Sequence, residues 1–235
     1  MQTVKKPARL LKSPVRSRPL KIVALGDSLV YGYGDPVGGG WTERLRRQWM
    51  RDLQTGHVLY NLGIRGNCVS QVTERLEGEF RYRGELRNQV PDLIILSVGV
   101  NDSPRLGQPN GRSFTDFTVF EQQINHLLHQ AQQLCPAIFI GMVPVCEEKM
   151  PFLGCFYFNH FDQYRYKETT KKACNNFNIP YLDIFDLWLG RGEDWLQSRL
   201  TSDGLHPNVV GYKSLLRDII DWQSISKLMT DVQLF

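Results

Sequence analysis

Short runs of apolar residues alternate along this chain with longer segments in which apolar residues recur every three or four positions. The five runs are Lys21–Leu25, Val58–Leu62, Leu93–Val98, Ala137–Val143 and Ile179–Ile184. Several of them are rich in Val, Ile and Leu without a polar break, which is typical of strands that are covered on both faces. The pattern therefore predicts five buried β-strands.

Helical periodicity fills the stretches between these strands. In the clearest example Phe120, Ile124 and Leu127 lie at helical spacing, and Pro136 ends the pattern. Further helical patterns cover Thr42–Leu53, Val69–Phe80, Phe161–Asn175 and Pro207–Trp222. Strands that alternate with helices form parallel sheets with helices on both faces, and such sheets bind ligands at the carboxyl ends of their strands. We therefore expect an α/β protein whose chemistry lies in the loops after the strands.

The positive charge of the chain is concentrated at its start. The 235 residues carry a net charge of +4, but residues 1–20 hold six Lys or Arg and no acid, which leaves −2 for the remainder. We expect residues 1–20 to form a basic, extended leader and residues 21–235 to form one domain. A slightly acidic domain argues against nucleic-acid binding by the folded part of the chain.

The sequence shows no sign of export, of a membrane anchor or of a bound metal. The leader lacks the apolar stretch of a signal peptide, and no apolar run approaches the roughly 18 residues that span a bilayer. The five cysteines include no C-x-x-C pair, although Cys146 and Cys155 could meet within one loop. We expect a cytoplasmic protein with no transmembrane anchor, no metal and no cofactor, and the sequence does not indicate its oligomeric state.

Four groups of polar and glycine residues stand where chemistry is expected. They are Gly26-Asp27-Ser28-Leu29 after the first strand, Asn61-Leu62-Gly63 at the end of the second, Asn101-Asp102 after the third, and Asp203-Gly204-Leu205-His206 near the C-terminus. In these motifs the chain resembles the SGNH hydrolases, also called GDSL esterases and lipases. The four signature residues of that family match Ser28, Gly63, Asn101 and His206, and the resemblance extends over residues 21–220.

The resemblance implies both a fold and a set of roles. The fold is a three-layer α/β/α sandwich around a five-stranded parallel sheet, flavodoxin-like, with strand order 2-1-3-4-5. Its crevice lies between strands 1 and 3, which would carry Ser28 and Asn101. The catalytic residues would be Ser28, Asp203 and His206. The main-chain N–H groups of Ser28 and Gly63 and the side chain of Asn101 would form the oxyanion hole.

The residue types themselves favour the same chemistry. A serine hydroxyl needs a base to take its proton, and His206 is the one histidine with an acid, Asp203, at a spacing that lets both side chains point one way. One helical turn would place the two on the same side, so that Asp203 orients the imidazole. Gly63 lacks a Cβ, so its backbone allows a close approach, and the Asn101 amide is a donor that does not titrate.

Each of these residues, taken singly, also has a purely structural interpretation. Asp27 and Ser28 could cap a helix, Gly63 and Asn101 are ordinary loop residues, and Asp203 could cap the last helix. Their occurrence together at strand ends, in catalytic order, favours the site. The G-x-S-x-G elbow of the larger α/β-hydrolases is absent, because position 30 is Val.

The expected function is metal-free hydrolysis of a small-molecule or lipid-like ester, possible also for a thioester, through an acyl-serine intermediate. Removal of O-acetyl groups from carbohydrates, acyl transfer to an alcohol, and a non-catalytic binding module are the alternatives. The segment Pro144–Phe161 is rich in aromatic residues, of which Phe152, Phe156, Tyr157 and Phe158 are predicted to line the substrate pocket. Packing of a long loop against the domain would explain the same residues equally well.

Overall fold

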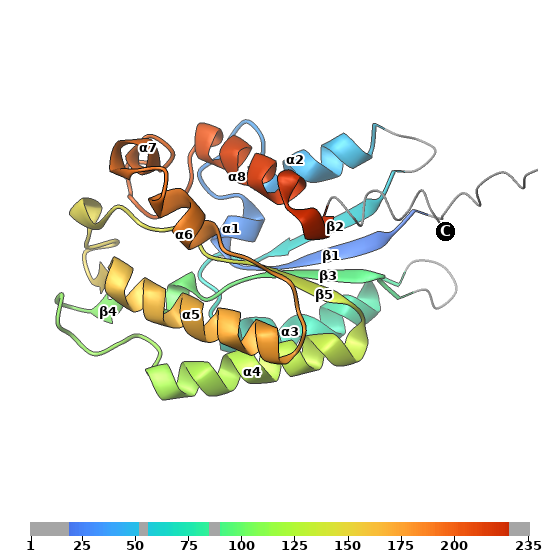
Figure 1. Cartoon of the computed structure of the whole chain (residues 1–235), viewed down its shortest axis with the longest axis horizontal. Coiled ribbons are helices and arrows are strands. Elements are labelled where there is room, and N and C mark those ends of the chain that lie inside the picture. Colours follow the sequence, from blue (N-terminus) through green and yellow to red (C-terminus); the bar gives the residue numbers. More distant parts are fainter. Residues whose placement is uncertain (1–18, 52–55, 85–89, 226–235) are drawn as a thin grey trace, which may run out of the picture.

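The computed structural model describes residues 19–51, 56–84 and 90–225, and most of the expected leader lies outside them. The described residues contain a five-stranded parallel sheet with the order β2-β1-β3-β5-β7 (Figure 1). Its strands are β1 (Lys21–Gly26), β2 (Val58–Gly63), β3 (Leu93–Ser97), β5 (Ala137–Ile140) and β7 (Tyr181–Leu182). The expected fold class and strand order are confirmed.

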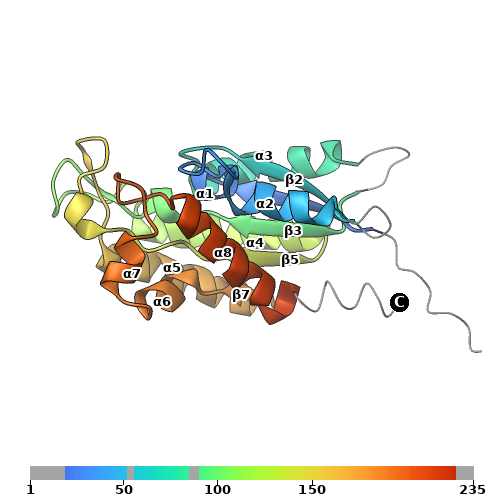
Figure 2. The same ribbon diagram turned by 90° about the horizontal axis from the view of Figure 1, so that it is seen from above.

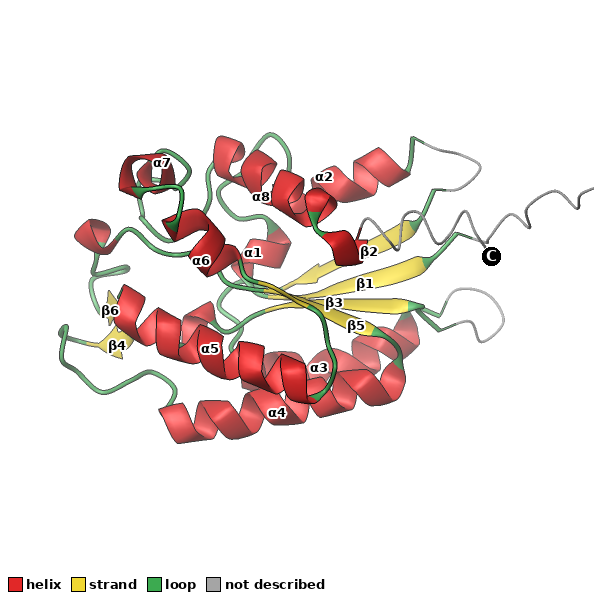
Figure 3. Cartoon of the chain, viewed as in Figure 1, coloured by secondary structure: helices red, strands yellow, loops and turns green. Residues whose placement is uncertain are grey.

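Helices cover both faces of this sheet (Figure 3). One face carries α3 (Val69–Tyr82), α4 (Phe117–Leu134) and α5 (His160–Asn176); the other carries α1 (Ser28–Tyr31), α2 (Gly40–Trp49), α6 (Ile184–Leu189) and α8 (Val209–Asp221), with α7 (Glu193–Gln197) beyond α6. Alternate residues of β1 enter the two cores: Val23 packs on the α3–α4 side and Ala24 on the α2–α8 side. Because helices cover both faces of the sheet, its strands are apolar along their length and appear in the sequence as unbroken apolar runs.

The far edge of the sheet differs from the sequence prediction. Strand β7 has two residues, where six were expected over Ile179–Ile184. The Asp183 side chain accepts the main-chain N–H of Asp186 and so begins helix α6, which takes Ile184 out of the strand. Helices α6 and α7 were not predicted, and β5 ends at Ile140 rather than at Val143.

A second, two-stranded antiparallel sheet was also not predicted. It pairs β4 (Arg105–Leu106) with β6 (Phe156–Tyr157) at the end of the molecule where the parallel strands finish. The 3₁₀ turns η1 (Val100–Asp102) and η2 (Glu147–Lys149) lie in the loops that lead to these strands. The pairing joins two loops about fifty residues apart in the sequence, so no local sequence pattern predicts it.

The crossovers diverge at the carboxyl end of β1. From β1 the chain passes through α1 and α2 to the edge strand β2, and it then crosses the opposite face through α3 to reach β3 (Figure 2). The ends of β1 and β3 therefore border the crevice at which parallel α/β sheets bind ligands.

The structure bears on two of the expectations, one about a disulfide and one about a membrane span. All five cysteines are free, so Cys146 and Cys155 do not form the disulfide that their proximity in sequence allowed. In the described part of the chain, no helix is both long enough and apolar enough to cross a membrane.

Candidate active site

Three residues that are far apart in the sequence form one hydrogen-bonded chain at the ends of β1 and β3. Ser28 is the first residue of α1, directly after β1. Its Oγ lies 2.9 Å from Nε2 of His206, and Nδ1 of His206 lies 2.7 Å from Oδ2 of Asp203. Ser28 and His206 are both buried, each 4 % exposed. This arrangement can pass a proton from the serine hydroxyl to the imidazole.

Asp203 is held in place by its other oxygen. The Thr201 hydroxyl and the main-chain N–H groups of Leu205 and His206 donate to Oδ1 at 2.6, 2.9 and 3.0 Å, which leaves Oδ2 for the imidazole. Partial burial alone would raise the pKa of Asp203, but the hydrogen bonds from His206, Thr201 and Leu205 hold that pKa well below its usual range. The carboxylate is therefore charged and fixed opposite His206.

The backbone between Asp203 and His206 differs from what we expected. The spacing of three residues is bridged by a turn at residues 202–203 and bends at residues 204–206, not by a turn of helix. The Asp203 side chain closes these turns through its bonds to the main chain, so the same contacts that orient the carboxylate also shape the loop.

The short helix that begins with the nucleophile is hydrogen-bonded to two longer helices on the same face of the sheet. The buried Tyr212 of α8 donates its hydroxyl hydrogen to the carbonyls of Ser28 and Tyr33, at 3.3 and 3.0 Å. The buried Thr42 of α2 donates to the carbonyl of Val30 at 3.0 Å. Short as it is, α1 is thus tied to two longer helices, which keeps Ser28 in one position.

Gly63 is the last residue of β2 and lies against this same turn. A Cβ placed on Gly63 would lie 2.1 Å from the main-chain N of Tyr31, so the absence of a side chain is required by the packing of α1. In the structure the backbone of α1 makes this close approach to Gly63. The Gly63 N–H donates to Oδ1 of Asn61 at 3.1 Å.

Asn101 belongs to the 3₁₀ turn η1 that follows β3. Its Nδ2 donates to the main-chain carbonyl of Asn67 at 2.9 Å. A primary amide has two N–H bonds, so this contact orients the amide and leaves the second N–H for another acceptor. Ser28 starts a helix, so its own N–H has no partner within α1. The predicted oxyanion residues therefore lie at the ends of three adjacent strands: β1, β2 and β3.

Two aromatic rings contact the imidazole of His206. The ring of Tyr33 meets it edge-on with 4.6 Å between centroids, and Phe152 does so from 5.8 Å. The guanidinium of Arg65 lies 3.8 Å from the centroid of the Tyr33 ring. Phe152 belongs to the predicted aromatic segment, whereas Tyr33 was not singled out from the sequence.

Of the other three predicted aromatic residues, two form strand β6 and one is buried in the core. Phe156 and Tyr157 form β6, and the Phe156 ring packs edge-on against Phe114 at 5.8 Å. Tyr157 borders a cavity of ≈ 620 Å³. Phe158 is 4 % exposed and packs in the core on the α3–α4 side. Within the described residues, Phe152 is the member of this group with a ring contact to His206.

Two buried carboxyl groups flank the site residues in the sequence. One oxygen of Asp27 accepts the Leu29 N–H at 2.9 Å, whereas Oδ2 is buried with no hydrogen-bond partner among the described residues. Asp102 accepts hydrogen bonds from the Val69 N–H and the Thr115 hydroxyl. Burial raises the pKa of Asp27 to about 7 and that of Asp102 to about 6. The negative charge of the nearby Asp102 also raises the pKa of Asp27.

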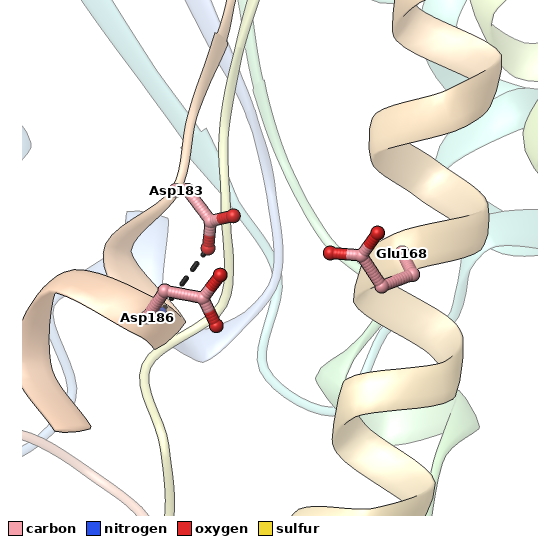
Figure 4. A group of neighbouring side chains, drawn as sticks. All are labelled: Glu168, Asp183 and Asp186. Atoms are coloured by element: carbon pink, nitrogen blue, oxygen red, sulfur yellow. Dashed lines mark hydrogen bonds between the residues drawn. The ribbon is translucent and has the colours of Figure 1, made fainter. Parts of the chain in front are cut away.

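One group of acidic residues in the described chain is close enough together to suggest a cation site. Glu168 of α5 faces Asp183 and Asp186 at the start of α6 (Figure 4). The ammonium of the buried Lys167 lies 2.8 Å from Glu168, 3.0 Å from Asp183 and 2.6 Å from Asp186. The side chain of this lysine supplies the positive charge that the three carboxylates need.

Sequence comparison identifies the family of the chain. The profile of the GDSL-like lipase/acylhydrolase family matches residues 24–214, a span that includes Ser28, Gly63, Asn101, Asp203 and His206. The chain belongs to this family. Among curated relatives, the uncharacterized protein YpmR of Bacillus subtilis (strain 168) is 23 % identical over 220 residues, which cover 88 % of this chain and 81 % of YpmR.

Solved structures of a lipase/acylhydrolase and of an acetylxylan esterase have a similar fold. The lipase/acylhydrolase from Enterococcus faecalis has a TM-score of 0.68 at 20 % identity, with 86 % of this chain and 93 % of that one covered. An acetylxylan esterase from Geobacillus stearothermophilus has a TM-score of 0.65 at 16 % identity, with 87 % and 94 % covered. At such identities the likeness establishes the fold of this GDSL-like protein.

Several residues around the site were missed from the sequence. Tyr33, Thr201 and Tyr212 have no motif of their own, and their roles depend on contacts between distant elements. Arg75 did carry a signal: it lies next to Leu76 and one turn after Val72, at the border of the buried face of α3. A charged residue on an apolar helix face indicates a specific partner.

Proposed function

We propose that this GDSL-like protein is a serine esterase that hydrolyses carboxylic esters through an acyl intermediate on Ser28. The observation that carries the proposal is the hydrogen-bonded chain from Ser28 through His206 to Asp203, with distances of 2.9 and 2.7 Å. Family membership supports the reaction class, and the position of the chain at the strand ends supports access to a bound ester.

The proposed reaction has two halves. Ser28 Oγ attacks the ester carbonyl while His206 Nε2 takes the hydroxyl proton, and Asp203 stabilises the imidazolium that forms. His206 then gives the proton to the leaving alcohol, and the acyl group remains on Ser28. Water enters, loses a proton to His206 and attacks the acyl carbonyl; His206 then returns that proton to Ser28 Oγ as the carboxylic acid leaves, which restores the free serine and the neutral imidazole.

The negative charge that develops on the carbonyl oxygen needs donors. We assign this role to the N–H groups of Ser28 and Gly63 and to the second N–H of the Asn101 amide. In the absence of substrate the Gly63 N–H donates to Asn61. In this proposal it donates instead to the oxyanion, whose charge makes it the stronger acceptor.

The proposal is tested at the nucleophile. We expect Ser28→Ala to lower kcat by at least about 10⁴-fold, because the acyl-enzyme cannot form. A fluorophosphonate should label the wild-type protein at Ser28 and leave the variant unlabelled, as measured by mass spectrometry. The matched control is Ser198→Ala, which removes a solvent-exposed hydroxyl that contacts Trp195 and Arg199 and should keep both labelling and turnover. Full turnover by Ser28→Ala would refute the mechanism.

Deacetylation of a carbohydrate is a second candidate, and one feature of the surface favours it. A cleft of ≈ 620 Å³ beside Asp203 is bordered by Tyr31, Tyr33 and Thr201. Tyr31 is 52 % exposed, and a tyrosine offers both an apolar face and a hydroxyl to a sugar ring. The structural likeness to an acetylxylan esterase is consistent with this reading.

A panel of esters separates the candidates. For a general esterase, kcat/KM should rise from p-nitrophenyl acetate to the butyrate and hexanoate, because each added methylene buries apolar surface worth about 0.8 kcal/mol. For a deacetylase, kcat/KM should fall along that series and an acetylated xylo-oligosaccharide should be the better substrate. Transfer of the acyl group to an added alcohol, in preference to water, would identify an acyltransferase that uses the same residues.

A further inference from the structure

The side chain of Arg75 reaches from α3 to the ends of two strands beneath the candidate site. Its Nη2 donates to the carbonyl of Gly26 at 2.8 Å, and its Nε donates to Oδ1 of Asn67 at 2.9 Å. The side chain is 15 % exposed. Gly26 is the last residue of β1 and stands two positions before Ser28, so one guanidinium contacts the segment that carries the nucleophile and the loop that follows β2.

Asn67 extends this contact to Asn101. The main-chain carbonyl of Asn67 accepts the hydrogen bond from Asn101 Nδ2 at 2.9 Å, while its side chain accepts from Arg75. The Asn67 N–H donates to the carbonyl of Ile64, which closes the loop into a turn. The orientation of the Asn101 amide therefore depends on a residue that Arg75 holds.

We propose that Arg75 and Asn67 are positioning residues for the oxyanion hole, which fix the Asn101 amide relative to Ser28. The inference rests on the proposed function, in which Asn101 donates to the oxyanion. A guanidinium is a planar fork whose N–H directions are rigid, so its bonds to Gly26 and Asn67 set the separation of the two segments. Displacements of about 1 Å at a reacting centre can cost about 100-fold in rate.

The charge of Arg75 offers a competing account of the same contacts. Arg75 lies close enough to the buried Asp27 to lower the pKa of that carboxyl, against the larger effect of burial, and its Nη1 is 3.9 Å from Glu79. If the charge alone mattered, a lysine at position 75 would preserve function. If geometry matters, lysine would fail, because one ammonium on a flexible stem does not reproduce the two directed bonds.

The test is a double-mutant cycle between Arg75→Met and Asn101→Ala, measured as kcat and KM for a p-nitrophenyl ester. We expect Arg75→Met alone to lower kcat by about 10- to 100-fold with KM changed less than about 3-fold, because the oxyanion contact forms mainly in the transition state. In the Asn101→Ala background the same substitution should cost less than about 3-fold, because the amide it positions is gone.

Companion variants keep the result interpretable. Asn67→Ala removes the acceptor for Arg75 but keeps the carbonyl that binds Asn101, so it should show a smaller loss that again disappears in the Asn101→Ala background. It also carries the test should Arg75→Met fail to fold, as judged by circular dichroism. Arg81→Met is the matched control: Arg81 lies on the same helix, is 66 % exposed and pairs with Glu77, so kcat should stay within about 2-fold.

Each outcome bears on a different claim. Equal losses from Arg75→Met in both backgrounds, or full activity of Arg75→Lys, would overturn the positioning role while leaving the esterase proposal standing. Normal kcat in Asn101→Ala alone would instead overturn the oxyanion role on which the inference rests. A non-additive loss that Arg75→Lys does not restore supports the proposal.

Discussion

Two carboxyl groups outside the proposed chemistry lie directly beside residues within it. Asp27 precedes Ser28 and Asp102 follows Asn101, and both are fully buried. An ionised carboxylate is costly to bury without a full set of hydrogen bonds, and one oxygen of Asp27 has no hydrogen-bond partner among the described residues. Burial therefore favours the protonated acid, and the proximity of Asp102 adds repulsion when both are ionised.

This placement gives Asp27 a definite effect on the pH dependence of stability. Its pKa is about 7 in the folded protein and 3.8 as a free group. Between these values the folded state binds more protons than the unfolded state, so the free energy of unfolding falls as the pH rises through this window. Asn at this position carries no charge and keeps the oxygen that accepts the Leu29 N–H.

We therefore expect the free energy of unfolding of Asp27→Asn, relative to wild type, to increase from pH 5 to pH 8. Urea denaturation at the two pH values measures this difference. The expected sign is opposite for Asp203. Its pKa is lowered in the folded protein, so Asp203 contributes stability that is lost as the pH falls below the ordinary pKa of an aspartate. A difference between Asp27→Asn and wild type that is the same at both pH values would contradict the assignment.

At the scale of elements, the centre of the sheet was more predictable than its edge. The ends of β1, β2 and β3 differ by no more than one residue from the apolar runs that predicted them. These strands have helices on both faces, so burial demands apolar residues along their whole length and the sequence shows where they stop. The position of the site follows, because the motif residues stand at those ends.

The edge strand β7 shows why the same reasoning fails elsewhere. Ile184 continues an apolar run, yet the Asp183 carboxylate caps α6 and the chain turns into a helix there. A capping side chain outweighs the apolar pattern because it supplies a hydrogen bond to an otherwise unpaired helix N–H. The pairing of β4 with β6 was hidden for a different reason, since it depends on contact between two distant loops.

Within the site, the sequence predicted the motif residues but not the contacts that hold them in place. Ser28, Asn101, Asp203 and His206 stand in recognisable motifs, and the structure brings them to neighbouring strand ends and the turn before α8. The partners of Asn101 are a main-chain carbonyl and, through it, a guanidinium from α3. Such contacts depend on how far side chains reach between elements, which sequence periodicity does not record.

At the scale of the whole molecule, the edge of the sheet is fastened by charge instead of by a long strand. Lys167 of α5 is completely buried and its ammonium contacts Glu168, Asp183 and Asp186. Burial alone would lower the pKa of Lys167, but the three carboxylates raise it above its usual value. This cluster joins α5 to the β7–α6 connection, and none of its described contacts involves Ser28, Asp203 or His206.

The separation of this cluster from the site leads to a prediction about stability. Lys167→Met should lower the free energy of unfolding by about 1.5–3 kcal/mol, because it removes the charge-assisted hydrogen bonds from the buried ammonium to the half-buried Asp183 and the exposed Asp186. Lys171→Met is the matched control: Lys171 is one turn further along α5, is 39 % exposed and also pairs with Asp183, so its substitution should cost less than about 1 kcal/mol.

Both variants should keep the wild-type kcat per folded molecule at a temperature where they are folded. Urea denaturation and ester turnover on the same preparations measure the two quantities. Loss of kcat in folded Lys167→Met would show that the sheet edge and the active site are coupled, and an undiminished free energy of unfolding would show that the carboxylates do not need this cation.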